Sequence, residues 1–301
     1  MKYLIDDILP TNQLHMLAGA HHSGKTFLLL QMLDDFRQGK MIWERRSHPV
    51  PFVYLTCDRN PEKFQERLNL MGIKDLPFVS AMDLKFKPSG WKWSQRLTAL
   101  RQLINHGRQK VPNAELFIID PLTLFVGGKS NDYSGLFGQL YEINQMAREE
   151  KITPLSSWHA GKLKKLDQFV RPEDRILGSG GGIGGAIETL LFLTGAKETQ
   201  DGLATLTIIP RDVPEWEYRL DRAKDGRFEV APDVEGVIAE HGLLRLIPKP
   251  PDWIDKATLA EKAKELLHIS EATVKRKLNE LIERGSVKRL EHGKYQRVLP
   301  N

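Results

Sequence analysis

The sequence predicts an α/β fold in which helices flank a mostly parallel sheet, followed by a small separate domain at the C-terminus. Three observations support this prediction. Between residues 14 and 195, short apolar runs alternate with stretches of helical periodicity. A glycine-rich motif ending in Gly-Lys-Thr lies between the first apolar run and the first helical stretch. Three prolines then precede an amphipathic tail.

The composition indicates a soluble globular protein with room for one large and one small domain. The chain has 301 residues, of which 41% are hydrophobic. No apolar run approaches the roughly 20 residues that span a bilayer, and the N-terminus is acidic where a signal peptide would be basic. We therefore expect a cytoplasmic protein with no membrane partner. Cys57 is the only cysteine, which excludes an intramolecular disulfide and disfavours a cysteine-based metal site.

The predicted elements follow one another in a regular order. Apolar runs predict strands at residues 14–19, 52–58, 115–120, 152–159 and 189–195. Helical periodicity predicts helices at residues 26–39 and 140–150. A further pair of strands is predicted at residues 203–212 and 215–222, with a short turn between them. This order is typical of an α/β domain with a mostly parallel sheet.

A proline-rich stretch divides the chain. We place a large domain at residues 1–235, a linker at 236–253 and a second domain at 254–301. The tail predicts two helices and a hairpin around His292 and Gly293. Its apolar positions on the helices are Leu259, Ala263, Leu266, Leu267, Val274, Leu278, Leu281 and Ile282. Residues 252–301 hold 11 Lys/Arg and 8 Asp/Glu, a mildly basic balance that suits a polyanion or an ordinary solvated surface.

Residues 19–26 read G-x-x-x-x-G-K-T after a strand-like run and before a helical one, which is the context of a phosphate-binding loop. In such a loop the backbone N–H groups hold phosphates, the lysine reaches the β and γ oxygens, and the threonine ligates Mg²⁺. We therefore expect ATP and Mg²⁺ as cofactors. The expected nucleotide-binding residues are Gly19, Ala20, His21, His22, Ser23, Gly24, Lys25, Thr26 and Phe27.

Polar side chains at the ends of three other strands are the remaining catalytic candidates. Asp120 ends an apolar strand and is expected to help hold the metal with Thr26. Asp58 could orient and polarise the attacking water, with Glu62 as a substitute, or it could cap the following helix. His159 could sense the γ-phosphate, or it could be a structural histidine.

The order of these motifs, together with "PEKFQERL", "IIDP", "WHAGK" and "RPEDRILGS", resembles the RecA-like ATPase core. Within that superfamily it most resembles the RepA-like branch of hexameric replicative DNA helicases and its AAA-family relatives, over roughly residues 1–230. The resemblance implies a homo-hexameric ring that hydrolyses ATP at its subunit interfaces and passes DNA through its centre. It also implies a role in the replication of a plasmid, phage or mobile element, with a replication or loader protein as a further partner.

The resemblance also implies roles for single residues. Lys25 and Thr26 match phosphate and Mg²⁺ binding, Asp120 the metal-directing acid, and His159 the sensor. The family's catalytic glutamate falls on Asp58, which is one methylene shorter, so efficient hydrolysis is in doubt. Arg211 falls where the family places an arginine finger that reaches the neighbouring subunit's γ-phosphate. Arg175 is its rival, and a plain surface arginine is the alternative.

Two regions are expected to contact DNA. The loops that line the channel of the family would carry Lys129, Lys162, Lys164, Lys165 and Arg171, unless these are ordinary solvated side chains. The tail resembles a winged helix-turn-helix, a module that binds DNA or docks protein. Its DNA-contacting residues would be Thr273, Lys275, Arg276 and Lys277 at the groove, and Lys288, Arg289 and Lys294 at the backbone.

The sequence is compatible with three functions. The first is a DNA-dependent ATPase that acts as a helicase or helicase-like motor. The second is an ATP-switched DNA-binding regulator or loader, with slow hydrolysis and site selection by the tail; Asp58 and the tail favour it, whereas the basic loops favour the motor. The third, a small-molecule kinase, explains the phosphate loop but neither the "DRILGS" segment nor the tail.

Overall fold

The computed structural model describes most of the chain. The described residues are 2–57, 61–84, 90–126, 133–160, 185–199, 203–231, 243–244, 246–248, 250–267, 271–283 and 286–298. They divide into two compact units, one of residues 1–211 and 221–229, the other of residues 212–220 and 230–301.

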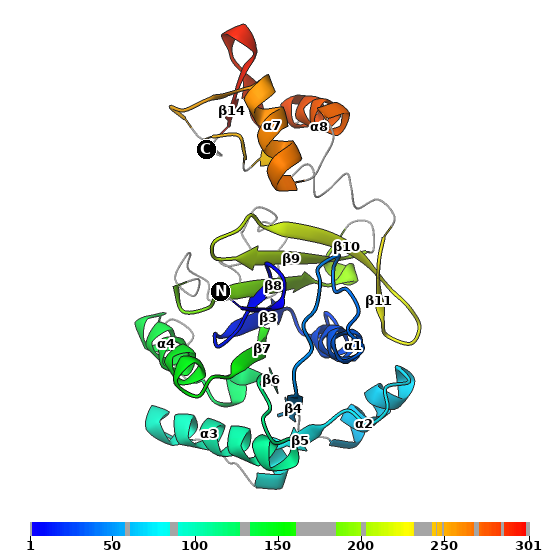
Figure 1. Cartoon of the computed structure of the whole chain (residues 1–301), viewed down its shortest axis with the longest axis vertical. Helices are drawn as coiled ribbons and strands as arrows, with labels where there is room; N and C mark the ends of the chain where they lie inside the picture. The colour runs from blue at the N-terminus through cyan, green and yellow to red at the C-terminus, as the bar shows by residue number, and fades with distance from the viewer. Residues whose placement is uncertain are drawn as a thin grey trace. The chain divides into compact units, whose positions relative to one another are not determined.

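The main sheet is mostly parallel (Figure 1). Among the described residues, nine strands form this sheet in the order β11-β10-β9-β8-β3-β7-β6-β4-β5. The strands from β8 to β5 in this order pair in parallel, whereas β9 runs antiparallel to β8. This confirms the predicted α/β class. The strand bounds are β3 (His15–Gly19), β4 (Phe52–Thr56), β5 (Phe78–Ser80), β6 (Leu116–Asp120), β7 (Thr153–His159), β8 (Thr189–Thr194), β9 (Ala204–Pro210), β10 (Trp216–Arg222) and β11 (Phe228–Val230).

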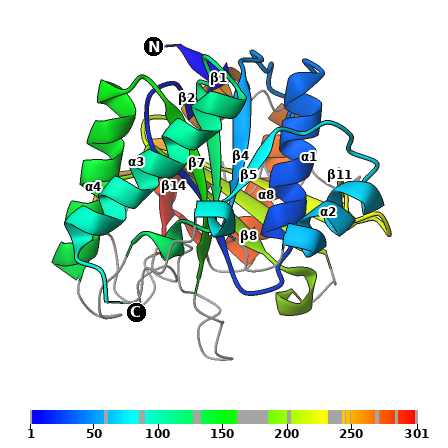
Figure 2. The same ribbon diagram turned by 90° about the horizontal axis from the view of Figure 1, so that it is seen from below.

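Helices cover both faces of this sheet (Figures 1 and 2). On one face lie α1 (Lys25–Arg37) and α2 (Pro61–Leu70), and on the other lie α3 (Trp93–Lys110) and α4 (Tyr133–Glu149). The strands β3 and β4 are buried along their whole length and β8 along all but its last residue, because a sheet covered on both sides offers no solvent-facing side. This explains why the sequence shows continuous apolar runs rather than alternating ones.

Alternate residues of β4 pack on opposite faces. The Tyr54 ring contacts Phe64 of α2, with 4.7 Å between ring centroids. Val53 and Leu55 belong to the core cluster that includes the buried residues of α3 and α4. A Cβ at Gly107 of α3 would lie 3.2–3.3 Å from side chains of that cluster, so α3 approaches the sheet closely. A large-to-small change here, such as Leu103→Ala at a fully buried position, should cost about 2–5 kcal/mol.

A short N-terminal hairpin precedes the sheet. Its strands are β1 (Tyr3–Ile5) and β2 (Leu9–Pro10), which pair antiparallel. The hairpin meets the main sheet at its neighbour β3, since the imidazole Nε2 of His15 lies 2.8 Å from the carbonyl oxygen of Pro10. His15 is fully buried.

The smaller unit carries the predicted helix pair and hairpin. Among its described residues, three strands form a sheet in the order β12-β14-β13, and α7 and α8 pack beside it. The bounds are β12 (Ile254–Asp255), α7 (Lys256–Leu267), α8 (Glu271–Glu283), β13 (Val287–Arg289) and β14 (Lys294–Arg297). The Asp255 carboxylate accepts hydrogen bonds from the amide and hydroxyl of Thr258. Asp255 thereby caps the N-terminus of α7.

One apolar prediction for the tail is wrong. Leu259 and Ala263 are fully buried, as expected, but the Leu266 side chain is 48% exposed. Leu266 therefore lies off the face of α7 that packs against Val274 and Leu278. The side chains of Leu267, Thr273 and Arg276 lie outside the described residues.

None of the helices in the described part of the chain is long and apolar enough to cross a membrane.

Candidate functional site

The phosphate loop connects β3 to α1. Its last glycine, Gly24, has φ 104° and ends the loop directly before the helix begins at Lys25. A Cβ at Gly24 would lie 2.6 Å from a ring carbon of Phe228, so backbone conformation and space both require glycine. Helix α1 has no acidic residue in its first turn and no side-chain bond at its cap. Its first N–H groups are therefore available to an anion.

The Lys25 ammonium lies within the loop. Its Nζ donates hydrogen bonds to the carbonyl oxygens of Gly19 and Ala20, at 2.9 and 2.8 Å. The side chain is buried. The loop thus holds a desolvated positive charge at the place where the motif binds phosphate, which strengthens its attraction for a polyanion.

The Asp120 carboxylate is the centre of a hydroxyl cluster. It accepts hydrogen bonds from the hydroxyls of Thr26 at 2.8 Å and Tyr54 at 2.6 Å, and also from the hydroxyl of Ser157. Burial, and then the negative charge of Asp120, raise the pKa of the Tyr54 phenol. Tyr54 therefore stays a neutral donor that orients the carboxylate. A hydroxyl and a carboxylate oxygen in contact are the hard ligands that Mg²⁺ prefers.

The order of the strands explains why these groups meet. Asp120 at the end of β6 pairs with Thr56 of β4, and Ser156 of β7 pairs with Ile119 of β6. On the other side of β7, His159 pairs with Gly19 at the end of β3. Because parallel strands end at the same edge of a sheet, Asp120, His159 and the phosphate loop all lie at that edge. The structure thus brings together the predicted residues Lys25, Thr26, Asp120 and His159.

Histidine rings form the wall beside Lys25. The rings of His21 and His159 stack with centroids 3.9 Å apart and an angle of 14° between their planes. The ring of His22 lies 5.9 Å from that of His21. Burial, and then the positive charge of Lys25, lower the pKa of His159 to about 4. At neutral pH His159 is therefore an uncharged imidazole, and its ring N–H can donate a hydrogen bond to a phosphate oxygen.

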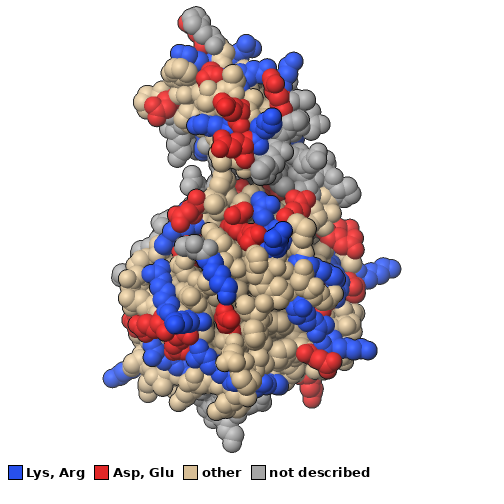
Figure 3. Space-filling view, viewed as in Figure 1, with Lys and Arg blue, Asp and Glu red and all other residues tan. Residues whose placement is uncertain are grey.

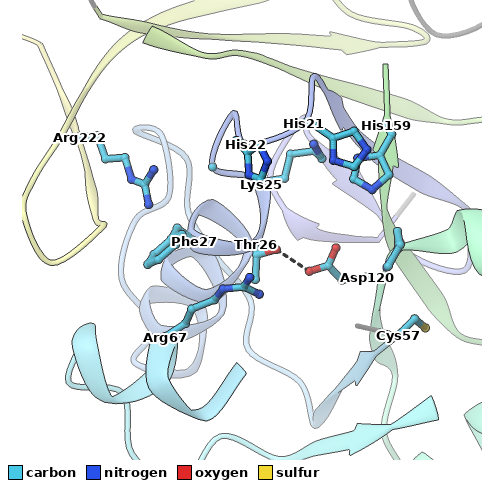
Figure 4. A pocket seen from close by; sticks show the side chains of 12 residues that line it. His21, His22, Lys25, Thr26, Phe27, Cys57, Arg67, Asp120, His159 and Arg222 are labelled. Carbon is cyan, nitrogen blue, oxygen red and sulfur yellow. Dashed lines mark hydrogen bonds between the residues drawn. The ribbon is translucent and has the colours of Figure 1, made fainter. Parts of the chain in front are cut away.

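These groups line one cavity of about 710 Å³ (Figure 4), within the usual range for small-molecule sites. Its lining residues are His21, His22, Gly24, Lys25, Thr26, Phe27, Cys57, Arg67, Asp120, Pro121, His159 and Arg222. Gly19, Ala20 and Ser23 belong to the loop but are not among the residues that line the cavity. Burial raises the pKa of the Cys57 thiol, so Cys57 is an inert neutral wall residue.

Sequence reasoning missed several residues of this site. Tyr54 and Ser157 lie inside apolar strands and resemble core residues, and only their pairing with Asp120 reveals their role. Arg67 comes from the last turn of α2 and Arg222 from the end of β10. Both arginines are far from the motif in the sequence, so no local pattern marks them as site residues. The signals that they do carry are an arginine on an amphipathic helix and an arginine at the end of a strand.

Arg211 lies elsewhere. It follows Pro210, which pairs with Thr189 at the start of β8, whereas Gly19 pairs with Leu193 near the end of that strand. Arg211 therefore lies at the end of the strands opposite to the phosphate loop. Its guanidinium donates a 2.7 Å hydrogen bond to the carbonyl of Gly185 and forms a 3.6 Å ion pair with the buried Glu188. Arg211 cannot act on the nucleotide of its own chain.

Other predicted site residues lie outside the described residues. These are Asp58, Lys129, Lys162, Lys164, Lys165, Arg171 and Arg175. Glu62, the substitute for Asp58, is an exposed residue in the first turn of α2 and is not among the cavity-lining residues.

The basic side chains of the tail differ in their surroundings. Lys275 of α8 and both Lys288 and Arg289 of β13 are exposed, and Lys277 is partly buried. The ammonium of Lys294 lies 3.4 Å from the centroid of the Trp253 ring, so this lysine already has an aromatic partner. Figure 3 shows basic and acidic side chains interspersed over the face in view.

Within the described residues, no group of three or more His, Cys, Asp or Glu side chains is placed to hold a metal ion. Proteins commonly bind Mg²⁺ through one or two carboxylates and the phosphates of a nucleotide. Thr26 and Asp120 are the residues that would hold it, since their oxygens are already 2.8 Å apart.

Comparison with protein families gives one match. Residues 1–165, more than half of the 301-residue chain, match the sequence model of a family described as an AAA domain. The match covers the phosphate loop, Asp120 and His159. A search of curated proteins finds no match to the chain.

Proposed function

The chain belongs to the AAA domain family and has the RecA-like P-loop ATPase core, and on this basis we propose that it is a DNA-dependent ATPase that works as a ring. The observation that carries the ATPase part of this proposal is the 2.8 Å hydrogen bond between Thr26 and Asp120 beside the phosphate loop. It joins the two expected Mg²⁺ ligands beside a buried lysine, which is the arrangement that binds and activates a nucleoside triphosphate.

In this proposal each described group has a separate task. The N-terminus of α1 and Lys25 hold the phosphates, while Thr26 and Asp120 present their oxygens to Mg²⁺. Bound Mg²⁺ neutralises charge on the β and γ oxygens. Tyr54 keeps the Asp120 carboxylate in place. His159 stays neutral, and its ring N–H donates a hydrogen bond to the terminal phosphate. In this way His159 senses whether that phosphate is present.

Turnover requires two further groups. Asp58 is proposed to polarise the attacking water, because it directly follows Cys57, which lines the cavity. Arg211 is proposed to act in trans on the nucleotide of a neighbouring subunit. Its position at the opposite sheet edge supports this, since a head-to-tail ring brings opposite edges of adjacent subunits together. Hydrolysis by an isolated subunit should therefore be slow.

The DNA partner and the six-subunit ring rest on the resemblance to RepA-like replicative helicases. In that assembly the segments after β6 and β7 would face the channel, and they contain Lys129, Lys162, Lys164, Lys165 and Arg171. Lysine and arginine contacts to phosphates do not depend on base sequence, as a motor requires. Replication of a plasmid, phage or mobile element, with a loader protein as partner, is the setting proposed.

A second function is favoured by one specific observation. The tail presents Lys275, Lys288 and Arg289 as exposed cations on its helix α8 and strand β13. If these residues bind duplex DNA as a winged helix-turn-helix does, the nucleotide could act as a switch on a slow ATPase, and the protein would be a regulator or loader. Asp58, with its shorter side chain, also suits slow hydrolysis.

Strand displacement separates the two functions. The experiment uses a forked DNA with one labelled strand, wild-type protein and Lys25→Ala as the matched inactive control. The motor is supported if wild type releases the labelled strand only with ATP and Mg²⁺ and Lys25→Ala does not. The regulator is supported if no strand is released but ATP changes the affinity for duplex DNA. No strand release and no ATP-dependent DNA binding would overturn both.

A further inference from the structure

The cavity has a second end, on the far side of Lys25 from the histidines. The guanidinium carbon of Arg222 lies 4.3 Å from the centroid of the Phe27 ring and 5.7 Å from that of Phe228. Figure 4 shows Arg222 and Phe27 on one side of Lys25 and Thr26, with His21 and His159 on the other. Among the described residues, no carboxylate pairs with Arg222. Arg222 is exposed and lines the cavity, so its guanidinium can meet a ligand there.

The segment that carries Arg222 is held rigidly against the phosphate loop. The Gln31 side chain of α1 makes two hydrogen bonds with the backbone of Phe228, at 2.6 and 2.8 Å. Arg227 donates a 2.7 Å hydrogen bond to the carboxylate of Asp34. A Cβ at Gly226 would lie 2.3 Å from the Phe27 ring, so this segment packs directly on that ring. Partial burial lowers the pKa of the Arg222 guanidinium, because desolvation disfavours the charged form.

The positions of the metal ligands set the direction of a bound nucleotide. Thr26 and Asp120 would hold Mg²⁺, which would neutralise charge on the terminal phosphates, so the terminal phosphate of a bound nucleotide is expected beside these two residues. His159 and its stacked partner His21 close that side of the cavity. The nucleoside must then leave the loop on the other side, where Arg222 and Phe27 lie. The cavity of about 710 Å³ has room for both parts.

We propose that Arg222, supported by Phe27, stacks on the nucleobase, and that the site accepts nucleoside triphosphates with little preference among the bases. This inference rests on the proposed nucleotide site and names its substrate class. A guanidinium plane stacks on any aromatic ring, since every base has a π-face. Among the described cavity-lining residues, the side chains on this side of Lys25 and Thr26 in Figure 4 are Phe27 and Arg222, neither of which has a carboxylate, amide or hydroxyl that would tell amino from keto groups.

The test compares ligands with and without a base. Calorimetric titration of the full chain uses ATP, GTP, CTP and inorganic tripolyphosphate, each with Mg²⁺. Arg222→Ala should weaken ATP binding about tenfold or more, because stacking of one base on such a residue has that size. It should change tripolyphosphate binding by less than about twofold, because the phosphates are held elsewhere. In the wild type, the affinities for ATP and GTP should agree within about tenfold.

Two further variants control the result. Arg222→Lys keeps the charge but loses the plane, so it should weaken ATP binding nearly as much as alanine does. Lys224→Ala removes an exposed charge from the same segment and should bind ATP as wild type does. Thermal melting of each variant confirms that it is folded.

Three outcomes would overturn the inference. Equal weakening of ATP and tripolyphosphate by Arg222→Ala would make Arg222 a phosphate contact. An unchanged ATP affinity would remove Arg222 from the site. A preference of about a hundredfold for one base in the wild type would mean that base edges are read. If the wild type binds neither ATP nor tripolyphosphate, the nucleotide site itself fails, and this result differs from failure of the stacking role alone.

Discussion

The hydroxyl of Thr26 donates a 2.8 Å hydrogen bond to Oδ2 of Asp120, a residue 94 positions further along the chain. Thr26 is the second residue of α1, the helix that follows β3 and the phosphate loop, and Asp120 ends β6, which lies two places from β3 in the sheet. The contact therefore exists only in the folded domain. It joins the two residues that the sequence motifs separately predict as Mg²⁺ ligands.

Tyr54→Phe should weaken Mg²⁺ binding without disturbing the fold. The variant removes the 2.6 Å hydrogen bond to Asp120 but keeps the ring that packs on Phe64. Loss of a supporting group behind a metal ligand typically costs about tenfold in metal affinity or activity. Titration of nucleotide binding against Mg²⁺ measures the effect, with binding in excess EDTA as the reference. An unchanged Mg²⁺ dependence would show that Tyr54 serves packing alone.

Gly24→Ala should lose nucleotide binding as well as stability. The new methyl group would meet the Phe228 ring at 2.6 Å, and the residue would keep a φ that alanine rarely adopts. Gly72→Ala is the matched control, because Gly72 also has a positive φ (66°) but has nothing within 4 Å of its Cβ position. The control should cost about 1 kcal/mol of unfolding free energy and leave binding unchanged. Equal binding by the two variants would contradict this account of the loop.

His15 should make the protein less stable as the pH falls below neutrality. Complete burial lowers the pKa of His15 to about 4, against about 6.5 in the unfolded chain. Between these values the unfolded state binds more protons, so unfolding free energy falls as pH decreases from about 6.5 to about 4, by up to about 3 kcal/mol. Denaturant unfolding at several pH values measures the slope. His15→Gln, which can still donate to Pro10, should reduce the slope and leave the part that comes from His159, whereas the exposed His106→Gln should leave the slope unchanged.

Mixing two inactive variants should restore ATP hydrolysis if Arg211 acts in trans. Asp58→Asn and Arg211→Ala should each bind nucleotide but fail to turn it over. In mixed rings about a quarter of the interfaces combine an intact Asp58 with an intact Arg211, so about that share of activity should return. Because Arg211→Ala leaves Glu188 without its ion pair, the double variant Arg211→Ala/Glu188→Gln serves as a stability control. A mixture as inactive as its parts would contradict the role of Arg211.

Much of this site could be predicted because its main residues follow strands. The phosphate loop follows one apolar run, and two other apolar runs end at Asp120 and His159. Parallel strands bring these carboxyl ends together at the same side of the sheet. The fold class was predictable for the same reason, since continuous apolar runs separated by helical periodicity indicate a sheet covered on both faces.

The supporting residues could not be predicted, because their roles depend on which strands become neighbours. Tyr54 reads as an ordinary core aromatic until β4 pairs with β6 and places its hydroxyl on Asp120. Arg222 is nearly two hundred residues from the phosphate loop, and no local pattern shows that its segment packs on Phe27. Leu266 fits the apolar periodicity of its helix but lies just beyond the packed face, an error of the kind expected near a helix end.

The measurement that tests the proposed ring ATPase most directly is steady-state ATP hydrolysis with and without single-stranded DNA, with the particle mass recorded by light scattering in the same buffer. The proposal predicts strong stimulation by DNA together with a mass of about six subunits, and loss of all hydrolysis in Lys25→Ala. Slow hydrolysis that DNA does not change, by a monomer or dimer, would contradict the motor and leave the phosphate loop as part of a switch.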